Sequence, residues 1–362
     1  MSYKTNSLNL GALEHALKGV NIPACPAVLV QIMDELNNPD ASDRRIATLI
    51  GEDVGIASLV VRSANSPLFS RGKRIASVAD AARLLGFGTV TNLVQEALLR
   101  SAIAVEDVSL ERFWDTSRIT AAANARLARS TGAARPETAY TFGLFHDCGM
   151  PLLIQRFDGY KAVLGQANTC TEGWFTDVED QALGTNHAIV GYFLARTWGL
   201  NDAVSLGILC HHDYSIFDGL NDLGDDARTL VAINAIGEHV ASTHLRTRND
   251  TDWSKARAPV AQYLSLTLAE LDDLADDLIY EFDREMDAET AWAATQHRAK
   301  NQKKAASLRP FCFKRDRRIR ASQRPSPAPP PALPAGSRAG YRPPAPCPAD
   351  RRPCRRPGGR RS

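Results

Sequence analysis

The amino-acid sequence predicts an all-α protein, and three features of its 362 residues support that fold class. Apolar residues recur at the spacing of one helix face over most of residues 1–300. The strict alternation typical of β-strands is nearly absent. Turn residues separate the apolar segments at short intervals, so we expect short helices joined by short connections in a compact bundle.

The first helices are predicted between residues 28 and 103. Pro26 stands where a first-turn proline is tolerated, and the helix after it ends at the Asn37-Asn38-Pro39 turn. Ser42 has a side chain suited to capping the second helix, and Gly86 suits a left-handed residue at the end of the fourth. In order, the predicted helices cover residues 28–36, 43–50, 54–64, 78–85 and 89–103.

Helical spacing continues beyond residue 110. One of the later helices is expected to break near Gly149 and Pro151. Ser265 or Thr267 can cap the last helix. These later predicted helices cover residues 114–127, 137–154, 187–198, 202–212, 229–244 and 268–282.

Charge divides the chain near residue 300. Residues 301–362 hold 17 Lys and Arg residues against 2 acids, a net charge of +15, together with 13 of the 20 prolines. Because the whole chain has a net charge of +2, residues 1–300 carry −13. Within them, the acidic run from Glu270 to Asp287 is interpreted as a solvated helix face, with a docking surface for a basic partner as the alternative.

The segment 301–362 is predicted to be a disordered Pro- and Arg-rich tail, because it has almost no large aliphatic residues to bury. Its charge would suit nucleic acid or an acidic membrane surface, and Pro331-x-x-Pro334 would suit an aromatic groove. A frameshifted end of a GC-rich gene would have the same composition. We assign no function to the tail, and nucleic acid is an expected partner only through it.

Nothing in the body of the chain indicates secretion or membrane insertion. Residues 1–17 lack the apolar run and cleavage pattern of a signal peptide, and no stretch reaches the roughly 20 apolar residues of a membrane span. Cys25, Cys148, Cys170 and Cys210 are widely spaced, which suits reduced thiols and no structural zinc. We expect a cytoplasmic protein that takes no cofactor.

Short motifs recur in a recognisable order along the body. Residues 22–105 contain Ile22-Pro23, Ala64-Asn65-Ser66, Leu84-Leu85-Gly86 and Asn92-Leu93-Val94. Residues 113–217 contain Phe113-Trp114-x-x-Ser117, Gly143-Leu144-Phe145-His146-Asp147, His187 and His211-His212-Asp213. Together these motifs resemble the HDOD domain, the HD-related output domain of bacterial signalling proteins.

The resemblance implies a two-lobed helical domain whose second lobe is related to HD phosphohydrolases. It places the HDOD domain at residues 21–217, with an N-terminal lobe at 21–108 and an HD-like lobe at 109–217. Residues 1–20 precede the domain. Residues 218–300 are expected to form helices that pack on the HD-like lobe, ahead of the tail at 301–362.

The resemblance also implies where a metal site would lie. HD hydrolases hold their metal ions with an early His, a His-Asp pair and a late Asp, and relatives active on cyclic di-GMP add further histidines. Here His146-Asp147 matches the pair, while His187, His211 and His212 match the further histidines.

Three positions depart from that pattern. Thr116 stands where the early His is expected, Asn234 where the late Asp is expected, and Met150 where relatives have a Lys. A hydroxyl and a neutral amide are poor replacements for an imidazole and a carboxylate as ligands of a divalent cation. We therefore predict a vestigial site without a bound metal, in which His146 and Asp147 form a buried hydrogen-bonded pair.

The remaining histidines have structural interpretations as well. His187 is interpreted as a capping or packing residue. His211-His212-Asp213 is interpreted as a solvent-facing helix end at least as readily as a ligand set.

The sequence thus predicts a non-enzymatic signal-transduction output module that binds a partner signalling protein, as HDOD domains generally do. The alternative is a metal-dependent HD-type phosphodiesterase acting on a cyclic nucleotide or dinucleotide, which the intact His146-Asp147 and His211-His212 favour.

Overall fold

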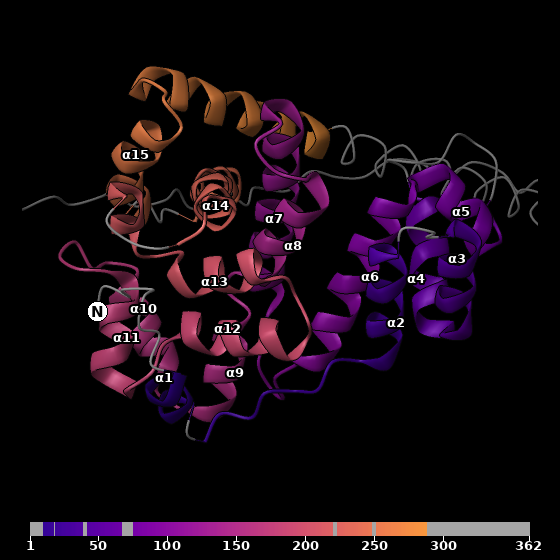
Figure 1. Cartoon of the computed structure of the whole chain (residues 1–362), viewed down its shortest axis with the longest axis horizontal. Coiled ribbons are helices and arrows are strands. Elements are labelled where there is room, and N and C mark those ends of the chain that lie inside the picture. The colour runs from indigo at the N-terminus through magenta and orange to yellow at the C-terminus, as the bar shows by residue number, and fades with distance from the viewer. Residues whose placement is uncertain are drawn as a thin grey trace, which may run out of the picture. The chain divides into compact units, whose positions relative to one another are not determined.

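The computed structural model describes residues 10–17, 19–38, 42–66, 75–219, 223–247 and 251–287, and every regular element in these ranges is a helix (Figure 1). The all-α prediction is therefore confirmed. None of the described helices combines the length and the apolar character that crossing a membrane requires. The predicted tail at 301–362 lies outside the described residues.

Five helices near the N-terminus share one hydrophobic core. They are α2 (Ala27–Asn37), α3 (Asp43–Glu52), α4 (Val54–Ala64), α5 (Val78–Leu85) and α6 (Phe87–Ala102). Ile32, Ile50, Val60 and Val94, from four of these helices, are fully buried in that core. Because each helix is short, it depends on burying one apolar face against its neighbours. The predicted bounds of α4 and α5 are confirmed.

Capping fixes where several of these helices begin. The Asp53 carboxylate and the Ser77 hydroxyl each accept a hydrogen bond from a backbone N–H in the first turn of α4 and α5. Ser42 occupies the N-cap position of α3, as predicted, but its side chain makes no cap hydrogen bond. Instead its backbone N–H donates to Glu35 Oε1 at 2.8 Å. Gly86 has a positive φ of 80°, but its ψ of 151° lies outside the left-handed helical region that we predicted.

A larger core lies among the helices that follow. It is built mainly from α7 (Glu111–Thr131), α8 (Pro136–Phe145), α9 (Gly149–Arg156), α12 (His187–Thr197), α13 (Asp202–Cys210) and α14 (Asp225–His244). On α8, Gly143 lets the backbone of α7 approach, since a Cβ added there would lie 2.7 Å from the Cα atom of Ala121. The predicted break separates α8 from α9, and Pro151 lies in the first turn of α9, where a proline is tolerated.

Several short helices were not predicted from the sequence. They are α1 (Leu10–Ala16), α10 (Tyr160–Ala167), α11 (Phe175–Leu183), the 3-10 helix η2 (Tyr214–Asp218) and α15 (Thr251–Tyr263). Gly165 lies inside α10 and Pro259 lies inside α15, so both segments contain a residue that disfavours a helix. Tertiary contacts hold α15 in place: Lys255 Nζ donates to the Cys170 carbonyl oxygen at 2.8 Å.

The last described helix covers residues 268–287. Thr267 caps it as predicted, because its Oγ1 accepts from the Glu270 N–H at 3.2 Å while its own N–H donates to the Glu270 carboxylate at 2.8 Å. Arg126 of α7 forms ion pairs with Glu281 and Glu285, which anchors the helix to α7. Most acidic side chains of the run are exposed, as expected of a solvated helix face.

Candidate metal-binding site

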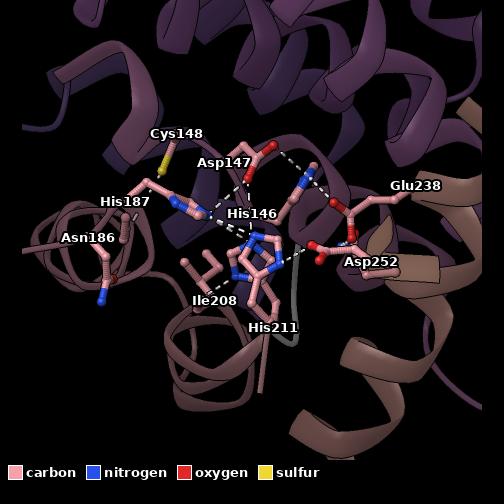
Figure 2. Close-up of polar contacts among 12 residues, drawn as sticks. His146, Asp147, Cys148, Asn186, His187, Ile208, His211, Glu238 and Asp252 are labelled. Carbon is pink, nitrogen blue, oxygen red and sulfur yellow. Dashed lines mark hydrogen bonds and ion pairs between the residues drawn. The ribbon is translucent and has the colours of Figure 1, made fainter. Parts of the chain in front are cut away.

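Four histidines and one aspartate meet where the ends of three helices come together (Figure 2). His146 and Asp147 follow α8, His187 is the first residue of α12, and His211 and His212 follow α13. The four histidines are at most 5% exposed. Burial of this many ionisable groups requires that they satisfy one another or bind a ligand.

A close contact between α9 and α12 places Asp147 beside His187. Gly149 begins α9, and a Cβ added to it would lie only 2.1 Å from the His187 carbonyl oxygen and 2.9 Å from the backbone nitrogen of Gly191. Because Gly149 and Gly191 lack side chains, the two backbones can meet directly. Asp147 Oδ1 consequently lies 3.3 Å from His187 Nε2.

Two of the imidazoles are oriented by backbone carbonyl groups. Nδ1 of His146 lies 2.7 Å from the Gly143 carbonyl oxygen, and Nδ1 of His211 lies 2.7 Å from the Ile208 carbonyl oxygen. A carbonyl oxygen only accepts, so both Nδ1 atoms carry a hydrogen. Their Nε2 atoms are left to face the interior of the cluster.

The other two imidazoles are oriented by carboxylates. Nδ1 of His187 lies 2.6 Å from Oε2 of the fully buried Glu179, whose other oxygen accepts a hydrogen bond from the Tyr160 hydroxyl. Nδ1 of His212 lies 2.7 Å from Oδ2 of Asp252 on α15. Metal-binding histidines in proteins are usually held from behind in this way, through the ring nitrogen that does not contact the metal.

The inward nitrogens of three histidines lie close together. Nε2 of His187 is 3.1 Å from that of His212 and 3.3 Å from that of His211. Asp147 Oδ1 is 3.5 Å from His211 Nε2, and all four groups offer ligand atoms within 4.8 Å of one another. Tetrahedral zinc ligands at their usual bond length stand about 3.3 Å apart. The donor spacing therefore fits a divalent transition-metal ion.

A second group of possible ligands shares Asp147. Nε2 of His146 lies 3.2 Å from Asp147 Oδ2 and 3.3 Å from Glu238 Oε1. Asn234, one turn before Glu238 on α14, donates from Nδ2 to Glu238 Oε2 at 3.0 Å. His146, Asp147 and Glu238 could together hold a cation. Glu238 also brings a carboxylate close to Asn234, the position where the sequence pattern predicts a late Asp.

Opposite charges hold protons on two of the histidines. Burial alone would lower the pKa of His146, but the carboxylates of Asp147 and Glu238 outweigh it and raise the pKa well above its usual value. Burial acts in the same way on His187, where Glu179 outweighs it and the pKa is raised to about 10. In the absence of a cation, both imidazoles therefore carry a proton at neutral pH.

The pKa values of His211 and Asp147 are shifted so that both groups stay deprotonated at neutral pH. Burial and the nearby imidazole of His212 lower the pKa of His211 to about 4, so His211 is neutral. Burial alone would raise the pKa of Asp147, but the charge of His146 and hydrogen bonds from the histidines hold it well below the usual value. An ionised Asp147 and a neutral His211 are the forms that bind metal ions.

A cavity of about 630 Å³ opens onto this cluster. Asp147, His212 and Glu238 line it on one side, and Asp252 and Trp253 of α15 form another part of the wall. The cavity is large enough for a small ligand, and it exposes the cluster to that ligand.

Five of the seven predicted site residues lie in the cluster, and the other two, Thr116 and Asn234, lie beside it. The structure brings His146, Asp147, His187, His211 and His212 together. Thr116 lies in the cavity wall, where its hydroxyl donates to the backbone of its own helix. Asn234 is buried beside the cluster and bonds to Glu238. The solvent-facing interpretation of residues 211–213 is wrong, since these side chains are at most 5% exposed.

Sequence reasoning missed Glu179, Glu238, Asp252 and Tyr160. Glu238 had a usable signal, because it lies four residues after Asn234 and hence on the same face of one helix. The others are single polar residues in segments with no motif, so only the tertiary structure brings them to the cluster.

An all-α domain with a His-Asp pair at the centre of a histidine cluster is of the HD-related class. The HDOD domain family matches residues 22–214, which is more than half of the chain. The chain therefore belongs to the HDOD family, as the motifs predicted.

One protein of known sequence is similar to just over half of the chain. An uncharacterized protein of Treponema pallidum (strain Nichols) is 26% identical over 196 residues, which are 53% of this chain and 38% of that protein. The chain thus spans well under half the length of this relative.

Three solved structures are similar in fold. A Marinobacter aquaeolei VT8 protein described as a candidate signal-transduction protein has a TM-score of 0.60 at 22% identity, over 80% of this chain and 65% of its own. A Shewanella amazonensis SB2B candidate phosphohydrolase has a TM-score of 0.56 at 22% identity, over 77% and 97%. A Geobacter sulfurreducens HDOD domain protein of unknown function has a TM-score of 0.54 at 24% identity, over 74% and 97%.

Proposed function

We propose that this chain is a signal-transduction output module that acts by binding a partner protein and does not hydrolyse a substrate. The observation that carries the proposal is the composition of α7. This helix contains no histidine, and Thr116 turns its hydroxyl back to the Arg112 carbonyl oxygen at 3.0 Å. The α7 residues that line the cavity are Arg112, Phe113 and Thr116, so this side of it offers no imidazole or carboxylate that would complete an HD-type catalytic centre.

The partner proposal rests on the family and on one structural neighbour. The chain belongs to the HDOD family, whose resemblance in the sequence implies a signalling output domain, and the Marinobacter neighbour is described as a candidate signal-transduction protein. A module of this kind transmits a signal by changing its affinity for a partner, which requires two arrangements of its helices and no chemical step.

Genetic complementation distinguishes this function from catalysis. Asp147→Asn removes the charge shared by both groups of possible ligands but keeps the shape of the side chain. In a strain lacking the gene, we expect the variant to restore the wild-type phenotype and to capture the same partner proteins as the wild type. Loss of complementation by a variant that is folded by circular dichroism would overturn the proposal. Asp276→Asn, on the exposed face of the last helix, is the matched control.

A second candidate function is a metal-dependent phosphodiesterase acting on a cyclic nucleotide or dinucleotide. The His/Asp cluster at the wall of the 630 Å³ cavity favours it. A cation bound there would lower the pKa of a coordinated water and so supply a nucleophile. Asp147 and the histidines would hold that cation, and Arg112 in the cavity wall would be available for a phosphate oxygen.

Turnover assays test this second function. Purified protein loaded with Mn²⁺, Fe²⁺ or Zn²⁺ is incubated with cyclic mononucleotides and dinucleotides. Hydrolysis that disappears in both His146→Ala and Asp147→Asn would establish the second function and exclude the first. We expect no hydrolysis above that of the two variants.

A further inference from the structure

The cluster depends on a segment outside the matched family domain. His146, His187 and His211 are oriented by Gly143, Glu179 and Ile208, all of which lie within residues 22–214. His212 is oriented by Asp252, which lies near the start of α15. The fourth inward nitrogen of the cluster is therefore positioned by a helix that begins 37 residues after the matched domain ends.

The contact between His212 and Asp252 is well defined by its surroundings. The two side chains are 5% and 21% exposed, and the distance from Nδ1 to Oδ2 is 2.7 Å. The ring of Phe175 stacks on the His212 ring, with centroids 4.8 Å apart and an interplanar angle of 7°. Phe175 fixes the plane of the imidazole, and the Asp252 carboxylate attracts its Nδ1 side as an ion-pair partner, although the two atoms are not aligned as a hydrogen bond. Nε2 of His212 consequently stands 3.1 Å from Nε2 of His187.

Separate contacts hold the same end of α15 over the cavity. Thr251 Oγ1 donates to the Asn168 carbonyl oxygen at 3.2 Å, and Lys255 Nζ donates to the Cys170 carbonyl oxygen at 2.8 Å. The ring of Trp253 stacks on that of His239, with centroids 4.4 Å apart. Asp252 and Trp253 both line the cavity. The first turn of α15 therefore contacts the α10 end, α14 and the cluster together.

We propose that Asp252 is a positioning residue that orients His212 for a divalent transition-metal ion, so that cation binding and the docking of α15 support each other. The inference rests on the cluster binding a cation, as the second candidate function also requires, but it needs no catalytic activity. A cation on Nε2 would make the His212 ring more positive, which would strengthen its ion-pair contact with the Asp252 carboxylate. Linkage then requires that docking of α15 raises the affinity for the cation by the same factor.

Cobalt binding to the full-length chain measures the first half of this coupling. Co²⁺ is titrated by its visible absorption and by competition with a chelator. Loss of a residue that holds a metal-binding histidine from behind lowers affinity 10- to 100-fold, about 1.4 to 2.7 kcal/mol. We expect that loss in Asp252→Ala together with a changed absorption spectrum. Asp252→Asn should fall between Asp252→Ala and the wild type, because the amide keeps a polar oxygen beside Nδ1 but loses the charge.

Hydrogen exchange of the α15 amides measures whether cation binding stabilises the docking of α15. Co²⁺ should slow exchange in the wild type and in the control Asp276→Asn, and should not do so in Asp252→Ala. A merely structural role for Asp252 would change metal-free stability and leave the cobalt spectrum and affinity unchanged.

The possible outcomes separate the proposals. Equal cobalt affinities for the wild type and both Asp252 variants would overturn the inference. Failure of the wild type to bind Co²⁺ would overturn it together with the second candidate function, and would leave the signalling proposal intact. Tight cobalt binding by the wild type that weakens in Asp252→Ala, with no hydrolysis in the turnover assays, would exclude the second candidate function and support the coupling.

Discussion

The contact between α9 and α12 can be tested with a single methyl group. In Gly149→Ala, the new Cβ would lie 2.1 Å from the His187 carbonyl oxygen and 2.9 Å from the Gly191 nitrogen. Ordinary contact between a carbon and an oxygen needs more than 3 Å, so the two backbones must separate by about 1 Å. Neither clashing atom belongs to a flexible side chain, so rotation about a side-chain bond cannot relieve the overlap.

The expected destabilisation follows from that separation. Overpacking of a close contact costs about 1–3 kcal/mol, and Gly149 lies at the first helical position of α9, where alanine gains little helix propensity. For a chain of this size we expect a melting temperature several degrees below that of the wild type. Movement of α9 also carries Asp147 away from His187, so cobalt affinity should fall in the same variant.

Gly165→Ala is the matched control for this experiment. Gly165 lies inside α10, is exposed, and has no atom within 4 Å of an added Cβ. Alanine should therefore stabilise the chain there, by about 1 kcal/mol. Thermal unfolding followed by circular dichroism compares the two variants. If Gly149→Ala melts at or above the wild-type temperature, the two helices are not in backbone contact and the reasoning is refuted.

Three further changes have expected outcomes. Gly237→Ala on α14 should also destabilise the chain, because an added Cβ would lie 2.0 Å from Oδ1 of Asn124, a fully buried side chain bonded to Asn234. A melting temperature equal to that of the wild type would contradict this. Glu179→Gln should lower the free energy of unfolding by about 3 kcal/mol, since it removes a buried ionic partner. The pKa of His187 is raised to about 10, so this ion pair stabilises the chelator-treated chain fully below about pH 6.5 and progressively less as the pH rises towards 10. Urea unfolding across that range should show the free energy of unfolding falling with pH in the wild type and not in the Glu179→Gln variant. Arg126→Met should loosen the last helix by about 1 kcal/mol by removing two ion pairs, and limited proteolysis should then cut near residues 281–287 first; unchanged cleavage would show that apolar contacts alone hold this helix.

Helices with an uninterrupted apolar stripe were predictable from the sequence. α4 and α5 have the predicted bounds because their caps, Asp53 and Ser77, directly precede a regular pattern. α10 and α15 were missed because Gly165 and Pro259 weaken the local signal. Those helices are stabilised by contacts with distant segments, and a pattern search along the chain cannot detect such contacts.

The candidate site was predictable to the extent that its residues belong to motifs. His146-Asp147 and His211-His212 are adjacent pairs, and the resemblance to a known family suggested their proximity. Glu179 and Asp252 determine how two of these histidines are turned, but each is one acid among many in an acidic body. Their role depends on a distance below 3 Å to a histidine on another element, eight residues along the chain for Glu179 and forty for Asp252, which composition and spacing do not encode.

The cluster is electrically balanced in two different ways, which bears on both proposed functions. Without a metal, protons on His146 and His187 offset the carboxylates around Asp147, and burial keeps His211 neutral. A divalent cation would supply the same charge as those two protons, so it could replace them without leaving a buried charge uncompensated. The same histidine orientations serve both forms, because each ring is held through Nδ1 and not through the inward nitrogen. A signalling role in the metal-free form is therefore compatible with a cluster whose donor spacing would also accept a cation.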